Sequence, residues 1–377
     1  GTIARAMKGA LVHDYLNQRG GAERVLEAVH ELYGGPPVYT SVFDRARMPE
    51  AYRRWDVRTS FLDRLPGARR RLRFYLPLLP TAFESFDLSG YDLVVSLSSA
   101  WAKSVVTGPD TCHASFLHTP MRFAWRTAES IGTSVARPFR LALDPFLTAL
   151  RAWDVVASQR VDGFLANSRN VAARIAKIYR RESRIVHPPV DCDFFRPGGP
   201  PGEHCLVVSR LRDYKRIDRA ILAAVRVGVR LRVVGTGEDA RRLRRLAGPT
   251  VEFVGEVDDE RLRDEYRSCR ALLLPGEEDF GMTALEAQAC GRPVVAYGRG
   301  GALESIRPGE TGLLFDSPTV EAMAAAIERA STLGFDPARI RAHAMEFDRK
   351  RFQERFRTAV EAVVEAWRAR RHGHDLP

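Results

Sequence analysis

Two glutamates in residues 275–296 have the side-chain type and the spacing of groups that bind a hydroxyl-rich ligand. Glu278 and Glu286 stand eight positions apart. Eight residues advance a helix by about 80° beyond two full turns, so a single helix would not turn both side chains to one side. We therefore expect Glu278 in a loop and Glu286 in the second turn of the helix that follows. The alternative is an acidic helix start that complements the helix dipole.

The start of the same helix adds hydrogen-bond donors to these two acceptors. N–H groups in the first turn have no partner within the helix, and they favour anions and oxygen-rich ligands. The four residues that would supply them are Phe280, Gly281, Met282 and Thr283. Carboxylates only accept hydrogen bonds, so the combined set suits a sugar or a ribose.

A basic pair follows another predicted strand. Arg210 and Lys215 stand five residues apart where residues 206–209 give way to a helix. An arginine presents a planar fork and a lysine a point charge, so the two can straddle two phosphates. A surface pair at a helix start is the alternative, which the helix dipole disfavours.

Two weaker signals lie where predicted strands of the first half end. Gly20 and Gly21 join a strand to a helix, and paired glycines let the backbone approach a ligand, although a plain tight turn would look the same. His118 follows a strand and could donate to a sugar hydroxyl or stabilise developing charge. A lone histidine is more often structural.

The segment VVGTGEDA resembles a dinucleotide-binding loop, because Gly235, Gly237 and Ala240 follow a strand and precede a helix. Dehydrogenases usually carry this loop at the first strand-to-helix turn of the cofactor domain. Here it is the second such turn, and the acidic group that follows begins at Glu256. We therefore disfavour a dehydrogenase.

The composition and the cysteine spacing argue against a membrane-spanning, a secreted or a zinc-binding protein. A chain of 377 residues suggests two domains, and 45% hydrophobic with 28% charged residues is ordinary for a soluble globular protein. No apolar run of about 18 residues is present, so we expect no membrane-spanning helix. GTIARAMK lacks the apolar core of a secretory signal, and residues 1–6 are expected to be an added remnant or a leader. Five scattered cysteines without a C-x-x-C pair favour reduced thiols in a cytosol and argue against a zinc site.

Strand and helix patterns alternate along the chain, which predicts parallel sheets built from βαβ units. The expected strands are residues 8–13, 38–42, 93–97, 114–118 and 163–166, then 206–209, 231–235, 251–254, 271–274 and 294–297. The expected helices include residues 21–33, 139–160, 171–179, 217–227, 239–247 and 260–268. We predict an α/β protein of two doubly wound, Rossmann-like domains, residues 1–188 and 204–348, with a Pro- and Gly-rich linker at 189–203. Residues 349–377 would form a C-terminal amphipathic segment, helical over 349–371.

The E-x(7)-E arrangement, the small-residue helix and the GRPVVA strand after it resemble the donor site of family 4 glycosyltransferases. The resemblance covers nearly the whole chain. It implies retaining enzymes of GT-B fold, whose two sheets face each other across a cleft and whose C-terminal helix crosses back to the first domain. It also implies that Arg210 and Lys215 hold the donor pyrophosphate, and that Glu278 contacts the hexose and Glu286 the ribose. The residues implied near the phosphates and the nucleotide are Gly20, Gly21, Gly235, Glu256 and the helix start at 280–283.

The segment HTPMRFAW, with HDY at residues 13–15 and GGAER at 20–24, resembles a subgroup of that family: bacterial mannosyltransferases of surface-polysaccharide assembly. The implied donor is GDP-mannose, and the implied acceptor is a glycan or a polyprenyl-linked glycan. His118 would lie against the hexose. The implied acceptor contacts are Asp14, Tyr15, Arg122 and Trp125, although loop capping suits Asp14 equally. Nothing resembles a D-x-D metal motif, so no metal is expected. A silent nucleotide-sugar-binding subunit, a UDP-sugar transferase, and an epimerase or phosphorylase of the same fold are the alternatives.

The net charge of +11 is concentrated next to an aromatic and apolar run. Arg69, Arg70, Arg71 and Arg73 precede Phe74. Basic residues beside apolar ones suit the surface of an anionic bilayer. We expect this patch to hold the protein peripherally on the cytoplasmic face of a membrane; a solvated basic face is the alternative. No nucleic-acid partner is expected.

Overall fold

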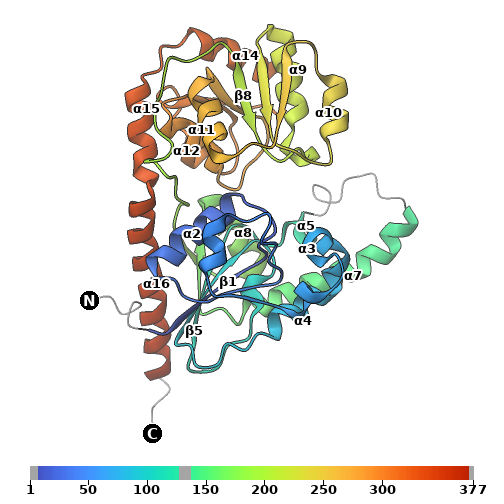
Figure 1. Cartoon of the computed structure of the whole chain (residues 1–377), viewed down its shortest axis with the longest axis vertical. Helices are drawn as coiled ribbons and strands as arrows, with labels where there is room; N and C mark the ends of the chain where they lie inside the picture. Colours follow the sequence, from blue (N-terminus) through green and yellow to red (C-terminus); the bar gives the residue numbers. More distant parts are fainter. Residues whose placement is uncertain (1–6, 127–136, 373–377) are drawn as a thin grey trace. The chain divides into compact units, whose positions relative to one another are not determined.

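The structure, a computed structural model, describes residues 7–126 and 137–372 and divides into two compact units (Figure 1). One unit is Gly1–His187 with Phe352–Pro377, and the other is Pro188–Arg351. Residues 1–6, which the sequence analysis assigned to a leader or a remnant, lie outside the described residues.

The first unit is built on a seven-stranded sheet in the order β3-β2-β1-β4-β5-β6-β7, and every neighbouring pair is parallel. The order reverses between β1 and β4. The strands are β1 (Gly9–His13), β2 (Val38–Thr40), β3 (Val57–Thr59), β4 (Leu93–Ser98), β5 (Cys112–Leu117), β6 (Gly163–Ala166) and β7 (Ser183–Ile185). The α-helices are α2 (Gly21–Leu32), α3 (Ala68–Arg71), α4 (Leu79–Glu84), α5 (Arg122–Trp125), α7 (Arg137–Ser158), α8 (Arg169–Tyr179) and, from Phe352 on, α16 (Arg349–His372).

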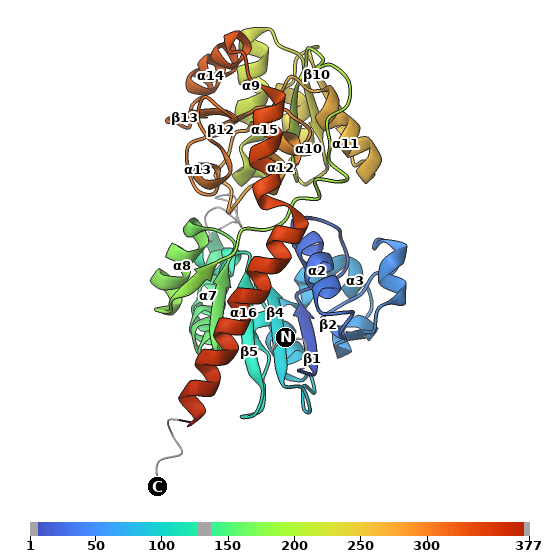
Figure 2. The ribbon, with the colours of Figure 1, turned by 90° about the vertical axis from the view of Figure 1, so that its left-hand side faces the viewer.

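Neighbouring residues on one strand pack against helices on opposite faces of this sheet, as expected of a doubly wound domain. On β5, Phe116 contacts Phe356 of α16, whereas Leu117 belongs to the cluster that α8 completes. Gly163 allows α16 to come close, because a Cβ atom there would lie 2.5 Å from the Val363 side chain. The C-terminal helix therefore packs along this sheet (Figure 2).

The second unit is built on a six-stranded parallel sheet in the order β10-β9-β8-β11-β12-β13, which reverses between β8 and β11. The strands are β8 (Cys205–Val208), β9 (Leu231–Val234), β10 (Val251–Gly255), β11 (Ala271–Leu274), β12 (Val294–Tyr297) and β13 (Gly312–Phe315). The α-helices are α9 (Ile217–Val227), α10 (Ala240–Leu246), α11 (Asp259–Ser268), α12 (Met282–Ala289), α13 (Ala302–Ser305), α14 (Val320–Thr332) and α15 (Pro337–Ala344).

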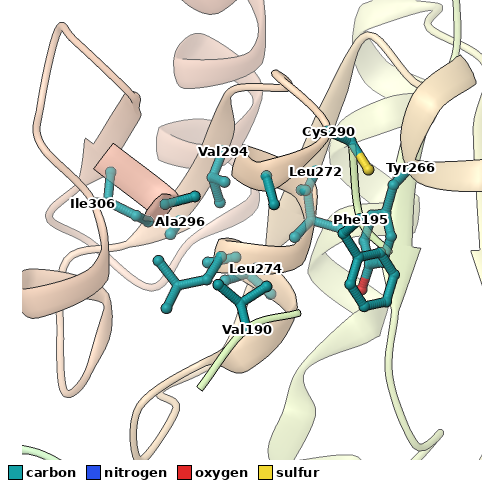
Figure 3. Packing of buried hydrophobic residues seen from close by; sticks show 14 of the residues in the cluster. Val190, Phe195, Tyr266, Leu272, Leu274, Cys290, Val294, Ala296 and Ile306 are labelled. Atoms are coloured by element: carbon teal, nitrogen blue, oxygen red, sulfur yellow. The ribbon is translucent and has the colours of Figure 1, made fainter. Parts of the chain in front are cut away.

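Helices cover both faces of this sheet. Inward-facing residues of α9, α10 and α14 pack on one face, and those of α11, α12 and α15 pack on the other. Figure 3 shows the second of these clusters, which also contains Val190 and Phe195. The first half of the expected linker at 189–203 is therefore part of a hydrophobic core. The Pro- and Gly-rich composition that suggested a linker marks an irregular backbone, and an irregular backbone can still be buried.

The predicted fold class, two doubly wound parallel-sheet domains, is confirmed. Two strands of the first unit were missed: β3 and β7 are three-residue edge strands whose side chains are mostly exposed, so they lack an apolar run. All five cysteines are buried free thiols, and burial raises the pKa of Cys205 to about 11 and of Cys290 to about 12. No helix in the described part of the chain is long and apolar enough to cross a membrane.

Candidate functional site

The strand reversal in the second unit brings two predicted site residues into contact. Lys215 ends the short helical turn after β8, and Glu278 lies in the loop after β11, the strand next to β8. The Lys215 Nζ atom lies 2.5 Å from the Glu278 Oε2 atom. Ligands of doubly wound sheets bind at such a reversal, outside the carboxyl ends of the strands. The two side chains remain 17% and 18% exposed, so a ligand can reach them.

Glycines hold the loops at this edge of the sheet against one another. Gly235 has a φ of 123°, and a Cβ atom there would lie 2.0 Å from the Ser209 carbonyl oxygen. A Cβ atom on Gly276 would lie 2.8 Å from the Lys215 carbonyl oxygen. The loops after β8, β9 and β11 thus pack backbone to backbone. Gly235, for which the family resemblance implies a place near the nucleotide, packs directly on the Ser209 backbone.

The helix start after β11 has the expected position, with one difference. Helix α12 begins at Met282, and its N-cap, Gly281, has a left-handed φ of 88° that glycine adopts without strain. The Phe280 side chain is buried in the core near Phe347. Phe280 therefore faces the core, and what this segment can offer a ligand is the backbone of the first turn, which includes Met282 and Thr283.

Glu286 lies in the second turn of α12, the position that the spacing predicts. The residue is only 5% exposed, and its Oε2 atom accepts a hydrogen bond of 2.7 Å from the hydroxyl of the buried Tyr266. Tyr266 is a partner that sequence reasoning missed. Two other predicted residues are exposed at this edge: Arg210 follows β8 and Glu256 follows the edge strand β10.

In the first unit, Asp14 is a buried cap of a loop. Its carboxylate accepts hydrogen bonds of 2.6 to 2.9 Å from four consecutive backbone N–H groups, those of Ser99, Ala100, Trp101 and Ala102. Its side chain is 2% exposed. An acceptor contact through this carboxylate is therefore wrong, because both oxygens are occupied at the reversal between β1 and β4. The capping role that the sequence left open is the one the structure shows.

The glycine loop after β1 lies next to a buried contact between His13 and Glu23, which sequence reasoning also missed. Gly20 caps α2 with an extended φ of −156°, and Gly21 is the first residue of the helix. Glu23, in the first turn, places its Oε1 atom 3.2 Å from Nε2 of His13, and both side chains are 2% exposed. This contact ties the helix start to the end of β1. The sequence signal for this contact was a histidine at the end of a predicted strand, followed by an acidic residue in the first turn of the next helix.

The HTPMRFAW segment follows β5. His118 is partly buried with its ring against Phe116, and its carbonyl oxygen accepts from the Asn167 side chain. Tyr15 and Arg122 are partly exposed. The Trp125 indole N–H, its sole donor, is directed at the buried carboxylate of Asp154 at 2.7 Å. Trp125 can therefore offer an acceptor only its ring.

The basic patch is smaller than the sequence suggests. Arg69 pairs with Asp63 through two hydrogen bonds of 2.7 and 2.8 Å, so its charge is balanced within the chain. Arg70, Arg71 and Arg73 are exposed, and the Phe74 ring, 66% exposed, lies 5.4 Å from the Arg73 guanidinium.

One segment of the second unit matches a known family model. Residues 200–347 match the family model described as glycosyl transferases group 1. The chain is 35% identical over 231 residues to a D-inositol 3-phosphate glycosyltransferase of Acidothermus cellulolyticus, covering 52% of this chain and 51% of that protein. It is 33% identical over 201 residues to a GDP-mannose-dependent alpha-mannosyltransferase of Mycolicibacterium smegmatis, covering 50% and 51%. The chain thus spans about half the length of these curated relatives.

Solved structures share the fold. The crystal structure of Anabaena HepE with UDP and glucose has a TM-score of 0.71 at 18% identity, and covers 94% of this chain and 99% of that one. Sucrose-phosphate synthase of Thermosynechococcus elongatus has a TM-score of 0.69 at 21% identity, and covers 95% and 96%. The fold is GT-B, as predicted.

We predict that Asp14→Ala lowers the free energy of unfolding by about 3 kcal/mol or more, since each buried N–H group left without an acceptor costs about 1–3 kcal/mol. Urea unfolding measures this change. Asp56→Ala is the matched control, because its partner is the exposed Arg58 and such pairs contribute about 0–1 kcal/mol. Wild-type stability of Asp14→Ala together with lost activity would instead restore the acceptor-contact interpretation.

Proposed function

We propose that this protein is a retaining glycosyltransferase of family 4 that moves a hexose from a nucleotide-sugar to a hydroxyl group of an acceptor. The observation that carries the proposal is the Lys215–Glu278 pair at the reversal of the second sheet, inside the segment that matches the group 1 model. A cation and a carboxylate 2.5 Å apart can serve the two halves of such a donor. Lys215 suits the diphosphate and Glu278 suits the sugar hydroxyls.

The chemistry follows from the leaving group. As the glycosidic bond breaks, its electron pair leaves with the nucleoside diphosphate, and the developing charge needs nearby cations or N–H donors. Lys215 and the exposed Arg210, both in the second unit, would supply them, so no metal is required. The acceptor hydroxyl attacks from the face that the diphosphate leaves, and its proton passes to the departing phosphate oxygen. The configuration of the anomeric carbon is thereby retained.

The two glutamates would have different roles. Glu278 is held by the Lys215 ammonium, so its carboxylate is better suited to orienting hydroxyls than to attacking the sugar as a nucleophile. Glu286, whose Oε2 atom accepts from Tyr266, would accept from the ribose hydroxyls. His118 would lie against the hexose.

We propose GDP-mannose as the donor. The HTPMRFAW segment and the GDP-mannose-dependent mannosyltransferase of Mycolicibacterium smegmatis support this choice. The UDP and glucose bound to HepE favour a UDP-sugar as the second candidate. Both donors would use the same cations on the diphosphate.

The donor is tested by thermal shift. GDP and GDP-mannose at 100 times their Kd should stabilise the fold by about 2.7 kcal/mol, whereas UDP and UDP-glucose should leave Tm unchanged. The GDP shift should persist in EDTA. Stabilisation by UDP alone would overturn the GDP assignment. Tight GDP-mannose binding with neither transfer nor donor hydrolysis would instead identify a catalytically silent binding subunit.

Substitution of the cation and substitution of the carboxylate in the Lys215–Glu278 pair should change the affinity for free GDP in opposite directions. Lys215→Ala and Arg210→Ala should each weaken GDP binding by about 1.5–3 kcal/mol, the value of a charge-assisted hydrogen bond. Glu278→Gln should bind free GDP at least as tightly as the wild type, because an anion that competes for Lys215 is removed. The same variant should lose about ten- to a hundredfold in sugar transfer, which corresponds to about 1.5–3 kcal/mol in the transition state.

Calorimetry with GDP and a transfer assay measure these effects. Arg226→Ala is the matched control, because Arg226 forms an exposed pair with Glu321 in the same unit. Weaker GDP binding by Glu278→Gln would contradict competition between the Glu278 carboxylate and the diphosphate for Lys215. Unchanged GDP binding by Lys215→Ala would contradict the assignment of Lys215 to the diphosphate.

The acceptor is proposed to be a glycan or a polyprenyl-linked glycan, met on the cytoplasmic face of a membrane. Three exposed arginines, Arg70, Arg71 and Arg73, lie on one segment with the exposed Phe74 and Leu78. Each arginine near an anionic surface contributes about 1 kcal/mol, and salt screens the attraction.

Vesicle co-sedimentation tests this docking face. The protein should bind vesicles that contain anionic lipid at low salt, and should be released by 0.5 M salt or by replacement of the three arginines with glutamine. Replacement of Arg241, Arg244 and Arg245, three exposed arginines of helix α10, removes the same charge and should leave binding intact. Equal loss in both triple variants would show that net charge, and not this face, is responsible.

A further inference from the structure

A fully buried ion pair in the first unit has no part in the proposed chemistry. Lys103 and Asp154 are both 0% exposed, and the Lys103 Nζ atom lies 2.5 Å from Asp154 Oδ1. The Lys103 ammonium also donates to the Ala100 carbonyl oxygen at 2.8 Å. Asp154 Oδ2 accepts from the Trp125 indole at 2.7 Å and from the Tyr179 hydroxyl at 2.9 Å. One carboxylate therefore joins α5, α7, α8 and the turn after β4.

Stability alone does not account for this pair. Two charges lose their hydration on burial, and apolar residues of similar volume often stabilise a core equally well or better. Burial, and next the charge of Asp154, raise the pKa of Tyr179 well above its usual value, so its hydroxyl remains a donor. Unlike apolar side chains, the carboxylate holds its partners in fixed directions, because each oxygen accepts from defined donors.

Hydrogen bonds connect the buried pair to the segment 118–126. Asp14 caps residues 99–102, and Lys103 follows directly. Asp154 then holds Trp125, and Arg151, one turn earlier on α7, donates from Nε to the Ala124 carbonyl oxygen at 2.7 Å. A continuous set of polar contacts thus runs from the end of β1, through the turn after β4, to α5.

We propose that Lys103 and Asp154 are positioning residues that hold the segment 118–126 in the conformation needed for transfer. Neither residue touches a substrate. The functional part of this inference rests on the proposed function, which places His118 of this segment against the hexose. The structural part, that the pair orders the segment, stands independently of it.

Hydrogen exchange of the full chain without ligand tests the structural part. The variant Lys103→Met/Asp154→Leu replaces the pair with apolar residues of similar size. We expect it to fold with a lower Tm than the wild type, because the Trp125 indole and the Tyr179 hydroxyl lose their acceptor. The amides of residues 118–126 should exchange at least tenfold faster. Trp125→Phe, which removes only the link to α5, should give the same local increase. Tyr179→Phe is the matched control, because it removes a hydrogen bond from the same Asp154 oxygen but leaves Trp125 attached. The Tyr179 hydroxyl also contacts the backbone of Met121, so Met121 is left out of the comparison. The other amides of 118–126 should exchange within about twofold of the wild-type rate.

Wild-type exchange in both the double variant and Trp125→Phe would overturn the inference, as would an equal increase in Tyr179→Phe. If the double variant does not fold, the comparison of Trp125→Phe with Tyr179→Phe decides. In a transfer assay the double variant should lose at least tenfold in kcat. Its affinity for free GDP should be unchanged, because Lys215 and Arg210, which we propose to hold the diphosphate, lie in the other unit. If the variants exchange faster but the wild-type protein transfers no sugar, the proposed function is rejected. The role of the pair in ordering the segment 118–126 would remain.

Discussion

The reversal of strand order within each parallel sheet is the constraint on which both candidate sites depend. Parallel strands joined by crossover helices are added outward from the first strand, and the later strands must then begin on its other side. In the second unit this happens between β8 and β11. The loops that follow these two strands become neighbours, and Lys215 meets Glu278 across 63 residues of sequence.

The same reversal is used differently in the first unit. Between β1 and β4 the position is filled by the chain itself, because Asp14 accepts four N–H groups of the loop after β4. A carboxylate of the protein occupies there the kind of N–H-rich site that elsewhere receives an anionic ligand. The first unit therefore has a rigid reversal, and the second has one whose charged groups can still be reached.

The two lysine–carboxylate pairs illustrate the physical basis of this difference. The Lys215–Glu278 pair is partly exposed, so water or a ligand can replace either partner at modest cost. The Lys103–Asp154 pair is fully buried, and separating its members would leave an uncompensated charge in the core. A pair whose partners a ligand can replace suits a binding site. A pair that stays together in the core suits the support of the segment 118–126. Glycines complete the exchangeable site, because Gly235 and Gly276 allow its loops to pack backbone to backbone.

The sequence by itself determined those features that short stretches of chain encode. The bounds of β6, α9, β11 and β12 were predicted to the residue, because apolar periodicity and Gly or Pro boundaries are local signals. The eight-residue spacing was enough to place Glu278 in a loop and Glu286 on a helix. Only the tertiary structure decided which of these residues meet. The contact of Lys215 with Glu278, the buried cap at Asp14, the neutralisation of Arg69 by Asp63 and the direction of Trp125 toward Asp154 all depend on strand order and on packing between distant segments. Local periodicity shows that a side chain is on a buried face or in a loop, but the partner it finds there is set by the elements that fold against it.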